Sequence, residues 1–159
     1  MIIKLKQKPD GSILKREILK LGGDYSKFDK LRMAGTSSVR IIYISGIVAF
    51  DADDRGIEGE ISFCSLQLLI DSLVLRFNTN QKISNYGIKN KNISELHFIQ
   101  SKTNESKNEF DEIIGGTLAI LLQDKTSIFF KIPYRKFDKT FKLFTKGKLV
   151  TRVNYSMEI

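Results

Sequence analysis

The sequence predicts a single, mainly β domain: a bent antiparallel sheet or partial barrel of about seven strands, capped by a C-terminal α-helix. Three observations predict this fold class. Two apolar runs, at residues 118–122 and 128–132, flank a polar turn and indicate a hairpin. Pro133 then ends the second strand, and the residues after it have the period of an amphipathic helix. A third run, at residues 39–50, is long, apolar and β-branched, which is typical of a strand.

The first 38 residues are predicted to form an N-terminal extension, and their pattern leaves its structure open. Residues 1–7 alternate as a strand does. Residues 12–21 fit either a second strand, paired back as a hairpin, or a short helix capped by a serine. The apolar residues within 24–33 have helical spacing. We therefore divide the chain into an extension, residues 1–38, and a sheet domain, residues 39–159.

The middle of the chain predicts further strands separated by polar turns. Residues 39–50 are expected to form one strand, in which Gly46 marks a bulge or a close approach of two backbones. The apolar spacing of residues 66–77 fits one helix and also two short strands, and we prefer the strands because the neighbouring segments are β. Other strands are expected at 59–64, 82–89 and 92–99, with an edge strand in 149–159 and an exposed loop at 101–111.

The predicted terminal helix, residues 134–144, has an aromatic face and a basic face. At about 100° per residue, Tyr134, Phe137, Phe141 and Phe144 fall in one sector, which we expect to pack on the sheet, whereas Leu143 falls outside it. Gly147 is expected to end the helix. The basic residues of the other face and its flanks form the candidate interaction surface, which we call the cationic surface: Lys131, Arg135, Lys136, Lys139, Lys142 and Lys146.

The net charge of +8 is concentrated in one segment. Residues 131–152 contain eight basic residues and one acidic residue, and therefore hold +7 of it. Such a segment can attract an acidic protein, a nucleic-acid backbone or an anionic membrane surface, or it can be a solvated helix face with no partner. A secondary acidic surface is predicted at Asp51, Asp53 and Asp54. Opposite charges at two separate places would permit head-to-tail self-association.

No pattern in the sequence predicts catalytic, cofactor-binding or metal-binding residues. His97 is the only histidine, and Cys64 lies in an apolar strand, where we expect a small buried side chain. The turn at residues 51–56 begins like a calcium-binding loop, but Arg55 occupies a ligand position and the flanks are predicted strands. We therefore expect a protein that is not an enzyme and has no cofactor. Because no signal peptide or membrane span is evident, a cytoplasmic location is expected.

Three segments resemble successive parts of a bacterial pleckstrin-homology-like or GRAM-like domain. The resemblance covers residues 39–148 and is carried by the phrases GEISF, DSLVLRF, KNISEL and LQDKTSIFFKIPYRKFDKTFKLF. It implies a strongly bent antiparallel sheet that is plugged by a C-terminal helix, and a module that holds anionic lipid head groups, peptides or partner proteins. Lipid-binding members usually place basic residues in the loop after the first strand, where this chain has its acidic surface. Inositol-lipid binding at that loop is therefore not expected.

These observations together predict a non-catalytic binding or scaffolding module. We expect it to act through protein–protein contacts, with a protein partner or with further copies of itself. The alternative is that the basic helix binds nucleic acid or an anionic surface such as a membrane. No small-molecule substrate is evident from the sequence.

Overall fold

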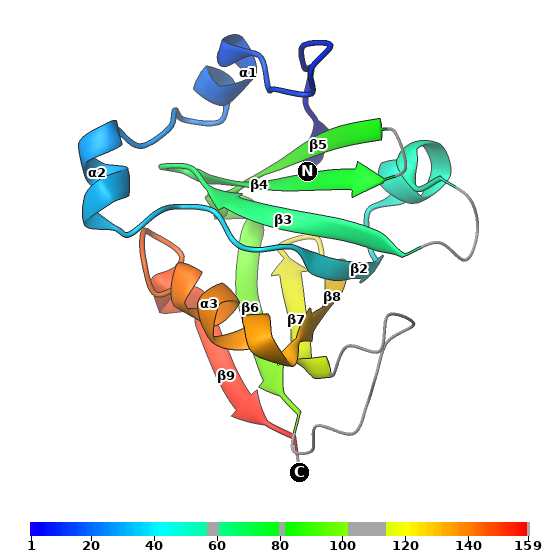
Figure 1. Cartoon of the computed structure of the whole chain (residues 1–159), viewed down its shortest axis with the longest axis vertical. Helices are drawn as coiled ribbons and strands as arrows, with labels where there is room; N and C mark the ends of the chain where they lie inside the picture. Colours follow the sequence, from blue (N-terminus) through cyan, green and yellow to red (C-terminus); the bar gives the residue numbers. More distant parts are fainter. Residues whose placement is uncertain (57–60, 80–81, 102–113, 159) are drawn as a thin grey trace.

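The computed structural model describes residues 1–56, 61–79, 82–101 and 114–158 (Figure 1). Within these ranges nine strands form one open sheet, in the order β1-β5-β4-β3-β2-β8-β7-β6-β9. Neighbouring strands are antiparallel, except that β6 and β9 are parallel. The mainly β class and the C-terminal helix are confirmed, but the strands number nine where about seven were predicted.

The strands are β1 Ile2–Lys4, β2 Ile41–Ser45, β3 Ser62–Leu68, β4 Ser72–Thr79, β5 Lys82–Lys89, β6 Ile93–Gln100, β7 Ile114–Leu122, β8 Ser127–Pro133 and β9 Val153–Met157. The helices are α1 Lys15–Lys20, α2 Lys27–Arg32 and α3 Phe137–Leu143, with short helical turns η1 Phe50–Asp54, η2 Asn90–Asn92, η3 Tyr134–Lys136 and η4 Val150–Arg152. The hairpin of β7 and β8, the preference for strands over a helix within residues 66–77 and the edge strand β9 are confirmed. The strand expected at 59–64 is not separate from the first of these strands, because β3 runs through residues 62–68. The loop predicted at 101–111 lies, apart from Ser101, outside the described residues.

The sheet bends at β2, so that β3, β4 and β5 cross the direction of β6, β7 and β8 (Figure 1). At the end of β2 the chain turns at Gly46, whose φ is +117°. A Cβ there would collide with the backbone carbonyl of Ser127, so glycine is required at this close approach. The prediction of one long strand over residues 39–50 was therefore wrong: β2 ends at Ser45, and η1 follows.

One main hydrophobic core fills the space between the two halves of the sheet. It includes residues from both halves and from α3. The largest fully buried side chains are aromatic, and the rings of Phe50 and Phe77 stack with their centroids 3.9 Å apart. Tyr43 of β2 contacts both of these rings edge-on. The bend at β2 is thus held by an aromatic cluster on its inner side.

Helix α3 closes the core, as predicted, but the buried face differs from the predicted one. Phe137 and Phe144 are buried, and Phe98 of β6 contacts both rings. Tyr134 is 49% exposed because it belongs to η3, before the α-helix begins. The buried stripe is wide enough to include Leu143, which was predicted to lie outside it. The helix ends at Leu143, before Gly147.

The N-terminal residues add an edge strand and two short helices. β1 pairs with β5, and α1 is the helical alternative for residues 12–21, with Leu14 rather than Ser12 at its N-cap. The end of α1 packs on the outer face of the sheet, where Leu21 and Val74 belong to a second, smaller hydrophobic cluster. α2 leaves its apolar side chains exposed, with Phe28 73% and Leu31 81% accessible. None of the helices in the described part of the chain combines the length and apolar character needed to cross a membrane.

Candidate functional site

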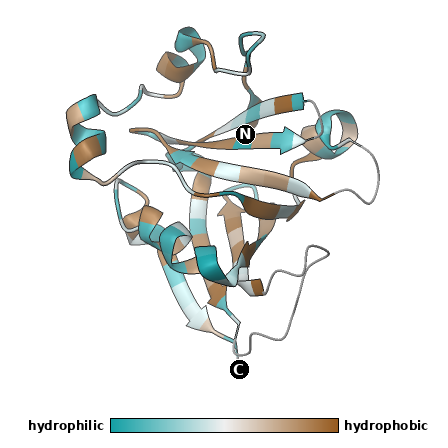
Figure 2. Cartoon of the chain, viewed as in Figure 1, coloured by the Kyte–Doolittle hydropathy of each residue, from teal (hydrophilic) through white to brown (hydrophobic). Residues whose placement is uncertain are grey.

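The six residues of the cationic surface lie on one continuous stretch of chain, but only three line a common groove. Lys131 lies on β8, and Arg135 and Lys136 lie in η3. The remaining three line a groove of about 290 Å³ together with residues from Ala34 to Val39, and we call this the α3 groove. In Figure 2, part of α3 has the teal colour of hydrophilic residues. The three residues that line the α3 groove are Lys139, Lys142 and Lys146.

None of the six cations forms an ion pair with a carboxylate among the described residues. The nearest polar contact across the α3 groove joins the ammonium group of Lys146 and the carbonyl oxygen of Gly35, 3.5 Å apart. The opposite wall carries the hydroxyls of Ser37 and Ser38. The α3 groove therefore presents positive charge on one wall and neutral polar groups on the other.

Of the three residues of the predicted acidic surface, Asp54 is buried. Its side chain has no exposed area, and its carboxylate lies 2.7 Å from the ammonium group of Lys4 and 2.5 Å from that of Lys82. The hydroxyl of Tyr86 also donates a hydrogen bond to it. Burial alone would raise the pKa of Asp54, but these three partners outweigh burial and lower its pKa to about 2. Asp54 is a structural residue that joins η1 to β1 and β5.

Asp51 is also engaged within the chain. It accepts hydrogen bonds from the hydroxyl of Tyr43 at 2.9 Å and from the guanidinium group of Arg55 at 3.2 Å. Burial, and then the neighbouring Asp51, raise the pKa of the Tyr43 phenol. Asp51 and Asp53 are both exposed, and of the three predicted acidic residues only Asp53 has no described partner. The three aspartates do not share one surface because they belong to the helical turn η1, where an open turn was expected. Its helical geometry turns their side chains in different directions.

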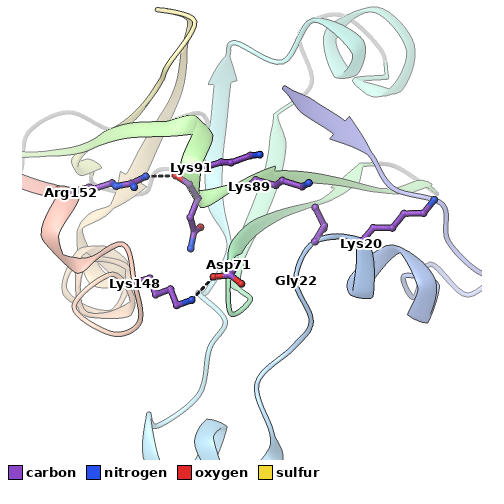
Figure 3. A pocket seen from close by; sticks show the side chains of 9 residues that line it. Lys20, Gly22, Asp71, Lys89, Lys91, Lys148 and Arg152 are labelled. Atoms are coloured by element: carbon purple, nitrogen blue, oxygen red, sulfur yellow. Dashed lines mark hydrogen bonds and ion pairs between the residues drawn. The ribbon is translucent and has the colours of Figure 1, made fainter.

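A second concentration of positive charge lies at another place, which we call the basic pocket (Figure 3). It has a volume of about 460 Å³ and is formed where four segments meet: the end of α1, the β3–β4 turn, the connection from β5 to β6, and the chain after α3. Figure 3 shows Lys148 turned toward Asp71, and Lys89 and Lys91 on the connection from β5 to β6. The charged residues that line the basic pocket are Lys20, Asp71, Lys89, Lys91, Lys148 and Arg152.

The walls of the basic pocket are joined by hydrogen bonds. The buried hydroxyl of Ser72 donates to the carbonyl of Leu21 at 2.5 Å, which fixes the end of α1 to the β3–β4 turn. The backbone N–H of Asn90 donates to the carbonyl of Asp71 at 2.8 Å. The guanidinium group of Arg152 donates to the carbonyl of Asn90 and, at 2.6 Å, to that of Ile93. All four segments are therefore tied to one another by contacts between residues far apart in sequence.

The charges of the basic pocket are poorly balanced. Asp71 is 54% exposed in its side chain and pairs with Lys148 at 2.5 Å, and this hydrogen bond raises the pKa of Lys148. Arg152 is held by neutral carbonyls, which do not cancel its charge. The other three lysines have no carboxylate partner among the described residues.

Sequence reasoning missed most of this pocket. Lys148 and Arg152 were counted in the basic segment, but Lys20, Lys89 and Lys91 were not singled out. No local pattern distinguishes them from other surface lysines, because the strand topology brings them together.

The residues considered for chemistry have ordinary settings. His97, half exposed on β6, contacts the carboxylate of Glu95 and lies 3.3 Å from the side-chain nitrogen of Asn154. Cys64 is buried, and burial raises the pKa of its thiol. Among the described residues, no three His, Cys, Asp or Glu side chains gather in a way that could hold a metal ion.

Comparison with known proteins gives no relative. The sequence matches no protein-family model, and neither the curated proteins nor the solved structures contain a match.

Proposed function

We propose that this chain is a non-catalytic binding module that takes an acidic segment of a partner protein into the α3 groove. The observation that carries the proposal is the set of cations on one wall of this groove, none of which has a carboxylate partner among the described residues. Like charges held close together repel one another. Carboxylates from a partner would relieve this repulsion, and the exposed hydroxyl of Ser37 could donate a hydrogen bond to them.

The partner is proposed to be a different protein rather than another copy of this chain. Head-to-tail assembly would require a second surface of opposite charge on the same molecule. In the turn predicted to be acidic, Asp54 is buried and Asp51 is engaged by Tyr43 and Arg55, so this turn offers only Asp53 to such an assembly. We therefore propose that a different protein supplies the negative charge.

A pleckstrin-homology-like fold is proposed for the same module. Its support is the bend of the sheet at β2 and the position of α3, which follows the β7–β8 hairpin and closes the core. Two features go beyond the expected pattern: β1 and the two short N-terminal helices, and the parallel strand β9 at the other edge.

Nucleic-acid binding is the second candidate function, and one observation favours it. The aromatic residues of the terminal helix were predicted to be buried, which argued against base stacking. Tyr134 is 49% exposed and precedes Arg135 and Lys136, so an aromatic face does lie beside two cations. Stacking of a base on an aromatic side chain next to basic residues is a common mode of single-strand binding.

The experiment measures the affinity of the full chain for a fluorescent glutamate-rich peptide and for a short single-stranded oligonucleotide. The test variant is K139E/K142E/K146E, which reverses the three charges that line the α3 groove. The control variant is K8E/K27E/K125E, which makes the same change in net charge at exposed lysines outside the α3 groove. We expect the test variant to weaken peptide binding at least about tenfold and the control to weaken it less than about twofold.

Relative affinity and Tyr134 separate the two candidate functions, because salt weakens the binding of both anionic ligands. Oligonucleotide binding that is tighter than peptide binding, falls steeply between about 50 and 200 mM salt and is weakened by Tyr134→Ala would replace the first proposal with the second. Equal losses in the test and control variants would show only a general effect of net charge and would refute both.

A further inference from the structure

We propose that the basic pocket is a binding site for a chain of phosphate groups, such as pyrophosphate or tripolyphosphate. This inference does not depend on the proposed protein partner, because the basic pocket and the α3 groove are lined by different residues. Its volume of about 460 Å³ is in the range of small-molecule sites in proteins.

The charge of the pocket identifies the class of ligand. Five cations and one carboxylate line it, so its net charge is +4. A single carboxylate or orthophosphate would leave much of this charge unmatched. A chain of two or three phosphate groups carries several negative charges in a line and offers many acceptor oxygens to ammonium and guanidinium donors.

The segments that carry the cations are held together before any ligand arrives. Their segments are connected by the hydrogen bonds from Ser72 to Leu21, from Asn90 to Asp71 and from Arg152 to Asn90. In addition, Leu21 packs so closely on β5 that a Cβ at Gly87 would lie 2.8 Å from it. Little backbone conformational entropy is therefore lost on binding, and the repulsion among the cations is relieved when an anion enters.

The residues that line the pocket exclude several other ligands. It has no aromatic lining residue, and Leu21 is its one large apolar side chain, so it has no surface for stacking a nucleotide base. The recognised chemistry is therefore the phosphate chain itself. That chain can come from a free inorganic oligophosphate or from the phosphate tail of a nucleotide, and the two sources can be told apart.

Asp71 leads to a prediction of increased affinity. It is the one carboxylate in the pocket and it occupies Lys148. Removing its charge would release Lys148 for the ligand and raise the net charge of the pocket. Asp71→Asn should therefore bind an oligophosphate more tightly than the unaltered chain, whereas most substitutions in a binding site weaken binding.

The test is isothermal titration calorimetry of the full chain with tripolyphosphate, pyrophosphate, orthophosphate, citrate and ATP at moderate salt. The pocket variant is K89Q/K91Q, and the matched control is K139Q/K142Q, which removes the same charge from the α3 groove. Unfolding in urea checks that each variant is folded.

We expect one tripolyphosphate per chain, bound more tightly than orthophosphate and citrate. K89Q/K91Q should lose at least about tenfold in affinity, K139Q/K142Q less than about twofold, and Asp71→Asn should gain about threefold. ATP binding equal to that of tripolyphosphate would assign the site to phosphate tails in general, and weaker ATP binding would assign it to free oligophosphate.

Three results would overturn the proposal: no saturable binding, tighter binding of citrate than of tripolyphosphate, or equal losses in K89Q/K91Q and K139Q/K142Q. The proposed function fails separately, because its own test relies on the peptide and on substitutions in the α3 groove. A chain that binds tripolyphosphate but not the acidic peptide would keep this inference and lose the proposed function.

Discussion

Asp54 and Asp71 each lie among lysines, but the two carboxylates differ in burial and in the number of cations around them. Asp54 is fully buried and meets two ammonium groups and a phenol. Asp71 is half exposed and pairs with one of the five cations around it. A buried carboxylate whose charge is neutralised by partners from two strands holds segments of the fold together. An open cluster with an excess of one charge gains free energy when it binds the opposite charge.

The largest expected effect is on Asp54. Replacing it with Asn would leave Lys4, Lys82 and Tyr86 without their shared acceptor, and we expect the free energy of unfolding to fall by about 2–4 kcal/mol. Asp71→Asn should change it by less than about 0.5 kcal/mol, because an exposed ion pair contributes little. Urea unfolding measures both, and equal losses would remove the distinction between the two clusters.

The pH dependence of stability should come from the same residue. The folded pKa of Asp54 is about 2, below its ordinary value of 3.8, so its contribution is present above pH 3.8 and is lost as the pH falls toward 2. The loss should amount to about 2 kcal/mol. Asp10 and Asp124 also have lowered pKa values, through hydrogen bonds from Ser12 and Thr126. The contribution of Asp54 is therefore the difference between the acid unfolding of the unaltered chain and of Asp54→Asn, and identical curves would contradict it.

Replacing a lysine with glutamine beside Asp54 and beside Asp71 compares the two clusters directly. Lys82→Gln removes an ammonium group from a buried carboxylate and should cost about 1 kcal/mol of stability. Lys148→Gln removes one from an exposed carboxylate and should cost nothing measurable. Thermal unfolding of the two variants at neutral pH checks this, and a larger loss for Lys148→Gln would reverse our assignment.

The smallest expected effect is an increase in the free energy of unfolding. K89Q/K91Q removes two unpaired charges from the basic pocket, so it should stabilise the chain by about 0.3 kcal/mol at low salt, because repulsion is relieved. The gain should disappear at high salt, where exposed charges are screened. Thermal unfolding at two salt concentrations tests this, and a loss of stability at low salt would mean that these lysines have structural partners.

The fold was predictable where neighbouring residues decide the structure. The β7–β8 hairpin and α3 follow from alternation, from Pro133 and from helical periodicity, all of which are local. The sequence-based prediction of secondary structure failed where contacts between residues remote in sequence determine the structure. Residues 39–50 form an apolar run, but the approach of Ser127 to Gly46 ends β2 early. Tyr134 was assigned to the helix face because the turn η3 has no distinct sequence signature.

The candidate site was predictable only in part. The cationic surface was identified because its residues are close in sequence, and three of them do line one groove. The basic pocket combines residues 20, 71, 89–91 and 148–152, which come together only in the folded sheet. The burial of Asp54 was equally hidden, because Lys4 and Lys82 reach it from strands that are remote in sequence.

The central claim is that unbalanced positive charge marks where this chain binds. The most direct measurement is a map of backbone amide chemical shifts of the full chain during titration with tripolyphosphate. The largest shifts are predicted at the ends of α1 and β5, at the β3–β4 turn and in residues 148–152. Shifts that instead gather around Asp54, or that spread evenly over all exposed lysines, would contradict the claim.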